Sequence, residues 1–276
     1  MGYGDEIMIT GYAKELKKKY PNHQIVAGNK KKGIIVDTEI FNNNPIIKRF
    51  SDLKNMQTLW IDSYSGRRPY FIEETKDRYI WNKKHRVIVG DLYFSENEDR
   101  FAQNILSDAI KWWHENNQKK YKKIIFVEPS RKKTIKNNVS HNRNWGIKKW
   151  QSFIDIYKEE YLFMQSIVNE SEVLKGIFNF QSSFREACAV IKNCDYIVGM
   201  EGGFTHATAA VNKKGLFLYG GYIDPLFIGY PSNTNIYINI DGSPCGMKTL
   251  CDHCKKCNEI MSINMISEKF LEMVTD

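Results

Sequence analysis

The chain has 276 residues, which is long enough for two ordinary α/β domains. Of these residues 42% are hydrophobic and 26% charged, a composition that argues against wholesale disorder. Its apolar runs are too short to cross a bilayer, and the N-terminal MGYGDE lacks a basic-then-apolar signal, so we expect a cytoplasmic protein. The formal net charge of +8 favours an anionic partner.

The first half begins with a glycine turn, Gly2-Tyr3-Gly4-Asp5, and a helical pattern that Pro21 ends. Such a turn normally follows a strand, but only Met1 precedes it here, so either a first strand is missing or the fold manages without one. Asp5 is then either a helix cap or a carboxylate at a cleft that acts as a general base. The spacing alone leaves both open.

Short strands are predicted next, and a polar turn at Arg67-Arg68-Pro69-Tyr70 precedes an aromatic-rich stretch that lines a cleft or fills a core. Ser95 opens a long helix to Asn116, with Glu98 as its capping-box partner. The polar residues 116–120 resemble a linker, so we place the domain boundary there. The three predicted strands are 24–27, 33–36 and 59–62.

The second half alternates strands and helices, which argues for a parallel sheet. A strand at 123–127 ends in Glu128-Pro129-Ser130, and a helix is predicted at 145–157. Ser183-x-x-Glu186 is a capping box that opens a further helix to Asn193.

A compact strand–turn–helix–strand unit follows at residues 196–219, with Glu201-Gly202-Gly203 as its turn. Backbone N–H groups and a helix N-terminus would meet there, so an anionic ligand is expected near Glu201–His206. The alternative is a plain turn with a histidine satisfied by packing.

The charge is concentrated in residues 121–149, which hold nine Lys/Arg against the single acid Glu128. This segment suits a nucleotide diphosphate, nucleic acid, an anionic membrane surface, or a solvated lysine-rich loop.

Four of the six cysteines cluster near the end, as Cys245-x5-Cys251-x2-Cys254-x2-Cys257. With no secretory signal, the options are a structural zinc site or free thiols that pack a loop. A catalytic metal is not expected, because four thiolates leave no open position for substrate.

These motifs resemble glycosyltransferase family 9, the heptosyltransferase-like family. The matched places are the N-terminal Gly-x-Gly-Asp turn, the segment Glu201–His206 followed by Ala207-Thr208-Ala209-Ala210, and Tyr219-Gly220-Gly221-Tyr222. The resemblance implies an α/β, GT-B-like fold with two Rossmann-like domains whose parallel sheets face a central cleft. It implies an acceptor-side domain at 1–118, a nucleotide-sugar domain at 121–262 and a C-terminal helix at 263–276.

The resemblance also implies site roles in an inverting, metal-independent transfer from a nucleotide-diphosphate sugar, in surface glycan or lipopolysaccharide-type assembly. Asp5 becomes the base, and Arg143 replaces a divalent cation at the phosphates. Glu201, which would repel phosphate, is expected to face a sugar or ribose hydroxyl. The acceptor would be a glycan or a lipid-linked sugar at the inner face of a membrane. The implied donor-binding residues are Ser130, Arg143, Glu201, Gly202, Gly203, Thr205 and His206.

Two other functions remain open. One is a binding protein whose basic segment and cysteines engage a nucleotide or nucleic acid, although the aromatic interleaving and finger spacing typical of nucleic-acid binding are missing. The other is a degenerate transferase that binds the donor without catalysis.

Overall fold

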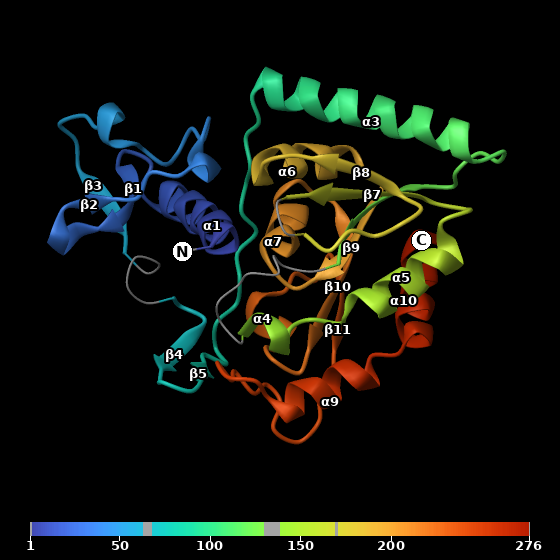
Figure 1. Ribbon diagram of the computed structural model, residues 1–276. Coiled ribbons are helices and arrows are strands. Elements are labelled where there is room, and N and C mark those ends of the chain that lie inside the picture. Colours follow the sequence, from blue (N-terminus) through green and yellow to red (C-terminus); the bar gives the residue numbers. More distant parts are fainter. Residues whose placement is uncertain (1, 63–67, 130–138, 169–170, 276) are drawn as a thin grey trace.

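The computed structural model describes residues 2–62, 68–129, 139–168 and 171–275, which form two lobes (Figure 1). The larger lobe is a six-stranded sheet in the order β11-β10-β9-β6-β7-β8, and every pair in it is parallel. The predicted α/β class is therefore confirmed. The strands are β6 (Ile124–Glu128), β7 (Leu162–Ile167), β8 (Phe178–Gln181), β9 (Tyr196–Met200), β10 (Lys214–Gly220) and β11 (Thr234–Tyr237).

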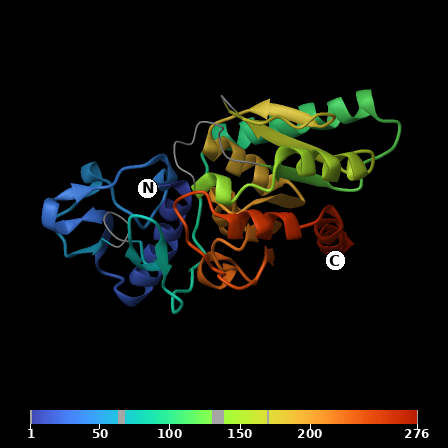
Figure 2. The same cartoon turned by 60° about the horizontal axis from the view of Figure 1, so that its bottom comes forward.

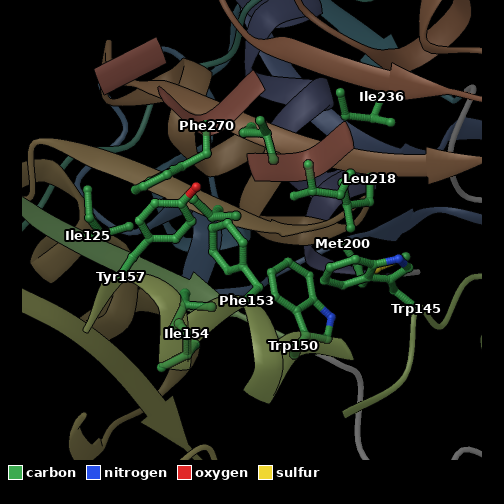
Figure 3. Packing of buried hydrophobic residues seen from close by; sticks show 14 of the residues in the cluster. Ile125, Trp145, Trp150, Phe153, Ile154, Tyr157, Met200, Leu218, Ile236 and Phe270 are labelled. Atoms are coloured by element: carbon green, nitrogen blue, oxygen red, sulfur yellow. The ribbon is translucent and has the colours of Figure 1, made fainter. Parts of the chain in front are cut away.

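Helices cover both faces of this sheet, so its central strands are nearly continuous apolar runs. In β6, Ile125 joins one buried cluster and Phe126 joins the other. Figure 3 shows the first cluster, where Phe153 and Phe270 from two helices pack on the strands. No helix in the described ranges has the length and apolar character needed to cross a membrane. The helices are α3 (Glu96–Asn116), α4 (Val139–Asn142), α5 (Ile147–Tyr157), α6 (Phe184–Asn193), α7 (Gly203–Ala210), α8 (Pro225–Ile228), α9 (Asp252–Ile260) and α10 (Ile263–Thr275).

Helix α3 lies on the larger lobe, although the predicted boundary at 116–120 assigns it to the N-terminal domain. Its buried Ala109 and Trp113 share an apolar cluster with Phe126, and Figure 1 shows α3 lying along α6. The helix packs on this lobe because its apolar stripe is stable only when it is buried against another element. We therefore propose that the boundary lies between Asp91, which is bonded to α1, and Ser95, which caps α3.

The smaller lobe contains α1, a three-stranded sheet and a hairpin. Strands form at the three predicted places, but the sheet is small and mixed, because β1 pairs in parallel with β3 and antiparallel with β2. Both views show this lobe beside the larger one, with α10 far from it (Figures 1 and 2). The elements are α1 (Tyr3–Lys19), β1 (Gln24–Asn29), β2 (Ile34–Ile35), β3 (Thr58–Ile61), β4 (Phe71–Glu74) and β5 (Tyr79–Trp81).

The lobes touch where α1 and α7 begin. A Cβ on Gly4 would lie 2.6 Å from Cδ2 of His206 and 3.5 Å from Cα of Gly203, so only glycine fits here without displacing the ring. Behind this contact, Ile7 and Ala207 share one buried cluster that spans the lobes. The glycine turn of the sequence is thus a place of close approach between two helix ends.

Arg185 of α6 is a second link between the lobes and is only 2% exposed. Its Nε and Nη2 donate to the carboxylate of Glu98 at 2.6 and 3.0 Å. Its Nη1 donates to the carbonyl of Glu39 in the smaller lobe at 2.8 Å, and Nη2 also reaches the carbonyl of Tyr93 at 2.7 Å. One guanidinium therefore fastens α3, α6 and the smaller lobe together.

Replacing Arg185 with methionine should lower the free energy of unfolding by about 3–5 kcal/mol, because it leaves Glu98 and two carbonyls without their buried donor. Urea unfolding measures this loss. Lys192→Met is the matched control, since the Lys192–Asp99 pair also joins α6 to α3 but is exposed, and its loss should cost less than about 1 kcal/mol. Equal losses in the two variants would contradict this role of Arg185.

Candidate functional site

A pocket of about 450 Å³ lies between the lobes, where β6 and β9 end. Its size suits a small-molecule ligand, and the carboxyl ends of parallel strands are the usual place for one in an α/β fold. The hairpin of β4 and β5 lines one side of the pocket. The predicted site residues that line it are Asp5, Arg143, Glu201, Gly202, Gly203 and His206.

Two helices, α1 and α7, begin at this pocket, and the backbones of their glycine turns line it. Free N–H groups and the helix dipoles make such ends favourable for an anion. Thr205, predicted to bind the donor, is fully buried and does not line the pocket. Its hydroxyl instead accepts a hydrogen bond of 3.1 Å from the N–H of Gly202, so Thr205 shapes the start of α7.

The carboxylate of Asp5 lies in the pocket wall with three donors around it. The Tyr70 hydroxyl donates to Oδ1 at 2.7 Å, and Nε of Arg68 lies 2.9 Å from Oδ2. The N–H of Gly2 also donates to Oδ2, at 3.3 Å. Asp5 therefore belongs to the capping box at the start of α1, and its carboxylate also lies at the cleft.

Arg68 and Tyr70 are pocket residues that the sequence analysis did not assign to the site. Burial and the charge of Asp5 raise the pKa of Tyr70 well above its ordinary value, so its hydroxyl keeps the proton that it donates. The aromatic stretch after this turn lines a cleft, since Phe71, Tyr79 and Trp81 face the same pocket. The sequence offered one signal for these two site residues, the arginine pair Arg67-Arg68 directly before the aromatic stretch.

Arg143 and Glu201, which also line the pocket, form a buried ion pair between Nη1 and Oε2. Burial acts against the charge of Arg143, but Glu201 and Tyr222 outweigh it and raise its pKa. The guanidinium lies 5.2 Å from the ring centroid of Tyr222. Its Nε is buried and has no hydrogen-bond partner within the described residues. Because arginine has five donors, this side chain keeps several for a ligand.

His206 lies on the first turn of α7 and is 3% exposed. Its Nδ1 lies 2.9 Å from the Tyr230 hydroxyl. Burial lowers the pKa of His206 to about 4, although Glu201 and Asp5 act in the opposite direction. At neutral pH the imidazole is uncharged, so it can offer a phosphate a hydrogen bond but no positive charge.

The basic segment at 121–149 is described only in part. Ser130 and the basic residues at 131–136 lie outside the described residues. Lys149 donates to the carbonyls of Asn258 at 2.6 Å and Met261 at 3.2 Å, so it fastens the end of α9 instead of facing a ligand. Within the described part of the segment, Arg143 is the basic residue that lines the pocket.

Four potential metal ligands gather in a second place, and we call them the cysteine–histidine cluster. Their ligand atoms all lie within 4.8 Å of one another. A hydrogen bond from Cys254 lowers the pKa of Cys245 to about 6. Cys257, which was also predicted as a ligand, packs in the first apolar cluster, and its sulfur lies 3.9 Å from Nδ1 of His253. The cluster is Cys245, Cys251, His253 and Cys254.

Residues 140–256 match the family model of glycosyltransferase family 9 (heptosyltransferase). The match runs from α4 into α9 and includes the ion pair, the glycine turn and His206. This segment belongs to glycosyltransferase family 9. Over this segment the chain is similar to glycosyltransferases of heptosyltransferase type, as the resemblance predicted. A search of curated proteins finds no match.

Solved structures of family 9 proteins share the fold. A glycosyl transferase family 9 structure from Veillonella parvula DSM 2008 is 13% identical, covers 100% of this chain and 95% of its own, and has a TM-score of 0.65. The iron-containing dodecameric glycosyltransferase TibC from enterotoxigenic E. coli H10407 is 11% identical, covers 99% of this chain and 74% of its own, and has a TM-score of 0.60. The predicted GT-B-like architecture is therefore confirmed.

The buried histidine should make the stability of this chain depend on pH. The pKa of His206 is about 4 in the folded chain and near 6.5 when unfolded, so between these values the unfolded chain binds more protons. Stability should therefore fall as the pH is lowered from about 6.5 to 4, by up to about 3 kcal/mol. His85, whose pKa burial also lowers, acts in the same direction.

Urea unfolding across this range measures the effect in the wild type and in His206→Gln. The glutamine does not titrate and can still bond Tyr230, so the variant should show a flatter profile. His114→Gln, at an exposed position of α3, is the control and should keep the wild-type profile. The same slope in His206→Gln and the wild type would contradict the assignment.

Proposed function

We propose that the protein transfers a sugar from a nucleotide-diphosphate sugar to an acceptor hydroxyl by a single inverting displacement, without a catalytic metal ion. The observation that carries this proposal is the composition of one pocket. A carboxylate from the smaller lobe, Asp5, faces the same space as the N-terminus of α7 and the spare donors of Arg143. A candidate base and a candidate anion site thus line the same pocket.

In this reaction Asp5 accepts the proton of the acceptor hydroxyl. The hydroxyl oxygen forms the new bond to the anomeric carbon as the bond from that carbon to the diphosphate breaks, and the electron pair leaves with the diphosphate. Arg68 and Tyr70 hold the carboxylate in place. A single displacement inverts the configuration at the anomeric carbon, because the acceptor enters opposite the leaving group.

The leaving diphosphate gains negative charge in this step, and the site offers three sources of stabilisation. The N–H groups at the start of α7 and the guanidinium of Arg143 would face its oxygens, and neutral His206 would add a hydrogen bond. A guanidinium can bind two phosphate oxygens at once, which lets it replace a divalent cation. Glu201 forms an ion pair with Arg143, and its carboxylate would also accept a hydrogen bond from a sugar or ribose hydroxyl.

The proposed donor is an ADP-sugar of heptose type. A TibC structure contains ADP-D-β-D-heptose, and that protein is 11% identical to this chain with a TM-score of 0.54 over 96% of it. The acceptor would be a surface glycan or a lipid-linked sugar, with the protein at the inner face of the membrane in lipopolysaccharide-type assembly. An aromatic wall of Tyr79 and Trp81 beside Asp5 suits an acceptor sugar face.

Thermal-shift measurements with ADP, UDP, GDP and CDP, and then with their sugars, test this function. A ligand at 100 times its dissociation constant should stabilise the fold by about 2.7 kcal/mol. Nucleoside monophosphates are the control and should give smaller shifts, because they lack the second phosphate. If all diphosphates fail to shift the melting temperature, the donor site is wrong; if they bind but no sugar is transferred to any acceptor, the protein is a binding homologue.

A further inference from the structure

The loop between β11 and α9 fastens three walls of the pocket together, and we call residues 243–251 the cysteine loop. Its first contact is with the segment after β10. The N–H of Cys245 donates to the carbonyl of Gly221 at 3.0 Å, and the N–H of Gly246 donates to the carbonyl of Tyr222 at 3.1 Å. Tyr222 is the residue whose ring lies beside the guanidinium of Arg143.

The second contact of the cysteine loop is with the β4–β5 hairpin of the other lobe. The N–H of Tyr79 donates to the carbonyl of Gly246 at 2.9 Å, and the N–H of Lys248 donates to the carbonyl of Asp77 at 2.7 Å. The ammonium of Lys248 also lies 2.6 Å from Oε1 of Glu74. The hairpin that forms the aromatic wall is therefore held by this loop.

The third contact is with Asn142, which is 4% exposed and directly precedes Arg143. Its side-chain amide donates to the carbonyls of Met247 at 2.9 Å and Thr249 at 2.7 Å, and its oxygen accepts from the N–H of Cys251 at 3.1 Å. The shape of the loop thus fixes the backbone beside the donor-site cation.

The cysteine–histidine cluster closes this loop at its base. Cys245 and Cys251 flank the residues that make the contacts, and His253 and Cys254 come from the first turn of α9. Tetrahedral zinc with bonds of about 2.3 Å to sulfur sets its sulfurs about 3.8 Å apart. The sulfurs of Cys245 and Cys254 are 2.9 Å apart, so they need to separate by less than about 1 Å to bind such an ion.

The hydrogen bonds around His253 leave one ring nitrogen for a metal. The Ser243 hydroxyl donates to the carbonyl of Ile238 at 2.9 Å, so it accepts from Nε2 of His253, at 3.0 Å. Nδ1 then keeps its lone pair and lies 3.9 Å from the sulfur of Cys257. A second hydrogen bond of this kind is typical of histidines that bind metals.

We propose that the cysteine–histidine cluster binds one Zn²⁺ ion, and that this ion holds the cysteine loop in the shape that fixes the hairpin, Tyr222 and Arg143 around the pocket. Four protein ligands leave no open position, so the ion is structural and takes no part in transfer. The ion itself is independent of the proposed function, whereas its effect on the nucleotide site rests on that function.

The metal content of the purified full-length chain tests the site. Mass spectrometry of the digested protein should find one zinc per chain in the wild type and in Cys257→Ser, which alters the cysteine outside the cluster. Cys251→Ser and Cys254→Ser should lose at least nine-tenths of it, while His253→Cys, which supplies a fourth thiolate, should keep it. An absence of zinc from the wild type, another metal in its place, or zinc loss in Cys257→Ser would overturn the assignment.

Chelation of the folded wild type tests the effect on the pocket. Removing zinc should speed amide exchange at Tyr79 and Lys248 at least tenfold and weaken ADP binding about tenfold, and added Zn²⁺ should restore both. Unchanged exchange after zinc loss would refute the role of the ion in holding the loop. If the purified wild type contains zinc but never binds ADP, the metal site stands and the proposed function fails. If the purified wild type contains no zinc before chelation but binds ADP, the metal site fails and the nucleotide site stands.

Discussion

Replacing Asp5 with asparagine is expected to lower the turnover number by about 10²- to 10⁴-fold, the usual contribution of a general base. Asparagine has nearly the same shape. Its oxygen can take the place of Oδ2 and accept from Gly2 and Arg68, while its amide group faces the Tyr70 hydroxyl, so the fold and donor binding should remain. Release of the nucleoside diphosphate in the presence of donor and acceptor measures the loss. The melting temperature should change little.

Glu6→Gln is the matched control for this experiment. Glu6 is the next residue of α1 and is also a buried carboxylate, but it accepts a hydrogen bond from Thr38 and does not line the pocket. Its variant should keep turnover within a few-fold of the wild type. If Asp5→Asn retains full turnover, Asp5 is only a helix cap and another group must take the proton.

Replacing Arg143 with glutamine should weaken the binding of nucleoside diphosphates by about 10- to 100-fold, because a hydrogen bond to a charged group contributes about 1.5–3 kcal/mol. Turnover should fall further, by about 10²- to 10³-fold in total, since the leaving diphosphate carries more charge in the transition state than in the donor. Calorimetry with ADP and steady-state kinetics measure the two effects separately.

Glu201→Gln separates the role of Arg143 from the stability of the ion pair. This variant removes the carboxylate that now occupies Arg143, so ADP should bind at least as tightly as to the wild type. Binding of the full nucleotide sugar should gain less than ADP binding, or weaken, if Glu201 also accepts a donor hydroxyl. Equal loss of ADP binding in Glu201→Gln and Arg143→Gln would mean that the pair supports the fold and not the phosphates.

Capping boxes and short apolar patterns predicted those helices and strands whose formation depends on residues close together in the sequence. Ser95 and Ser183 each cap a helix with a glutamate three residues later, as the structure shows. The unit from β9 to β10 also lies within a few residues of its prediction. The edge strands β8 and β11 were missed, because the asparagines and glutamine of FNFQ and TNIY break the apolar pattern expected of a buried strand.

The site was predictable only where one short motif carries it. The turn at Glu201–Gly203 predicted an anion site, but the partner of Glu201 comes from 58 residues earlier in the chain. Arg68 reaches Asp5 only because the segment before β4 folds back on the start of α1. The spacing of the cysteines could not predict that Cys257 packs in the apolar cluster while His253 lies beside the other thiols. Which side of α9 faces the core depends on the direction in which this helix runs.

The N-termini of α1 and α7 meet at one pocket, and this should affect the release of the nucleotide product after the sugar has been transferred. A nucleoside diphosphate carries more negative charge than its sugar ester, so the ends of α1 and α7 should hold the spent nucleotide more tightly than the donor. We therefore expect departure of this product to limit the rate of each cycle. The enzyme would work fastest where a phosphatase or a kinase keeps the free diphosphate scarce.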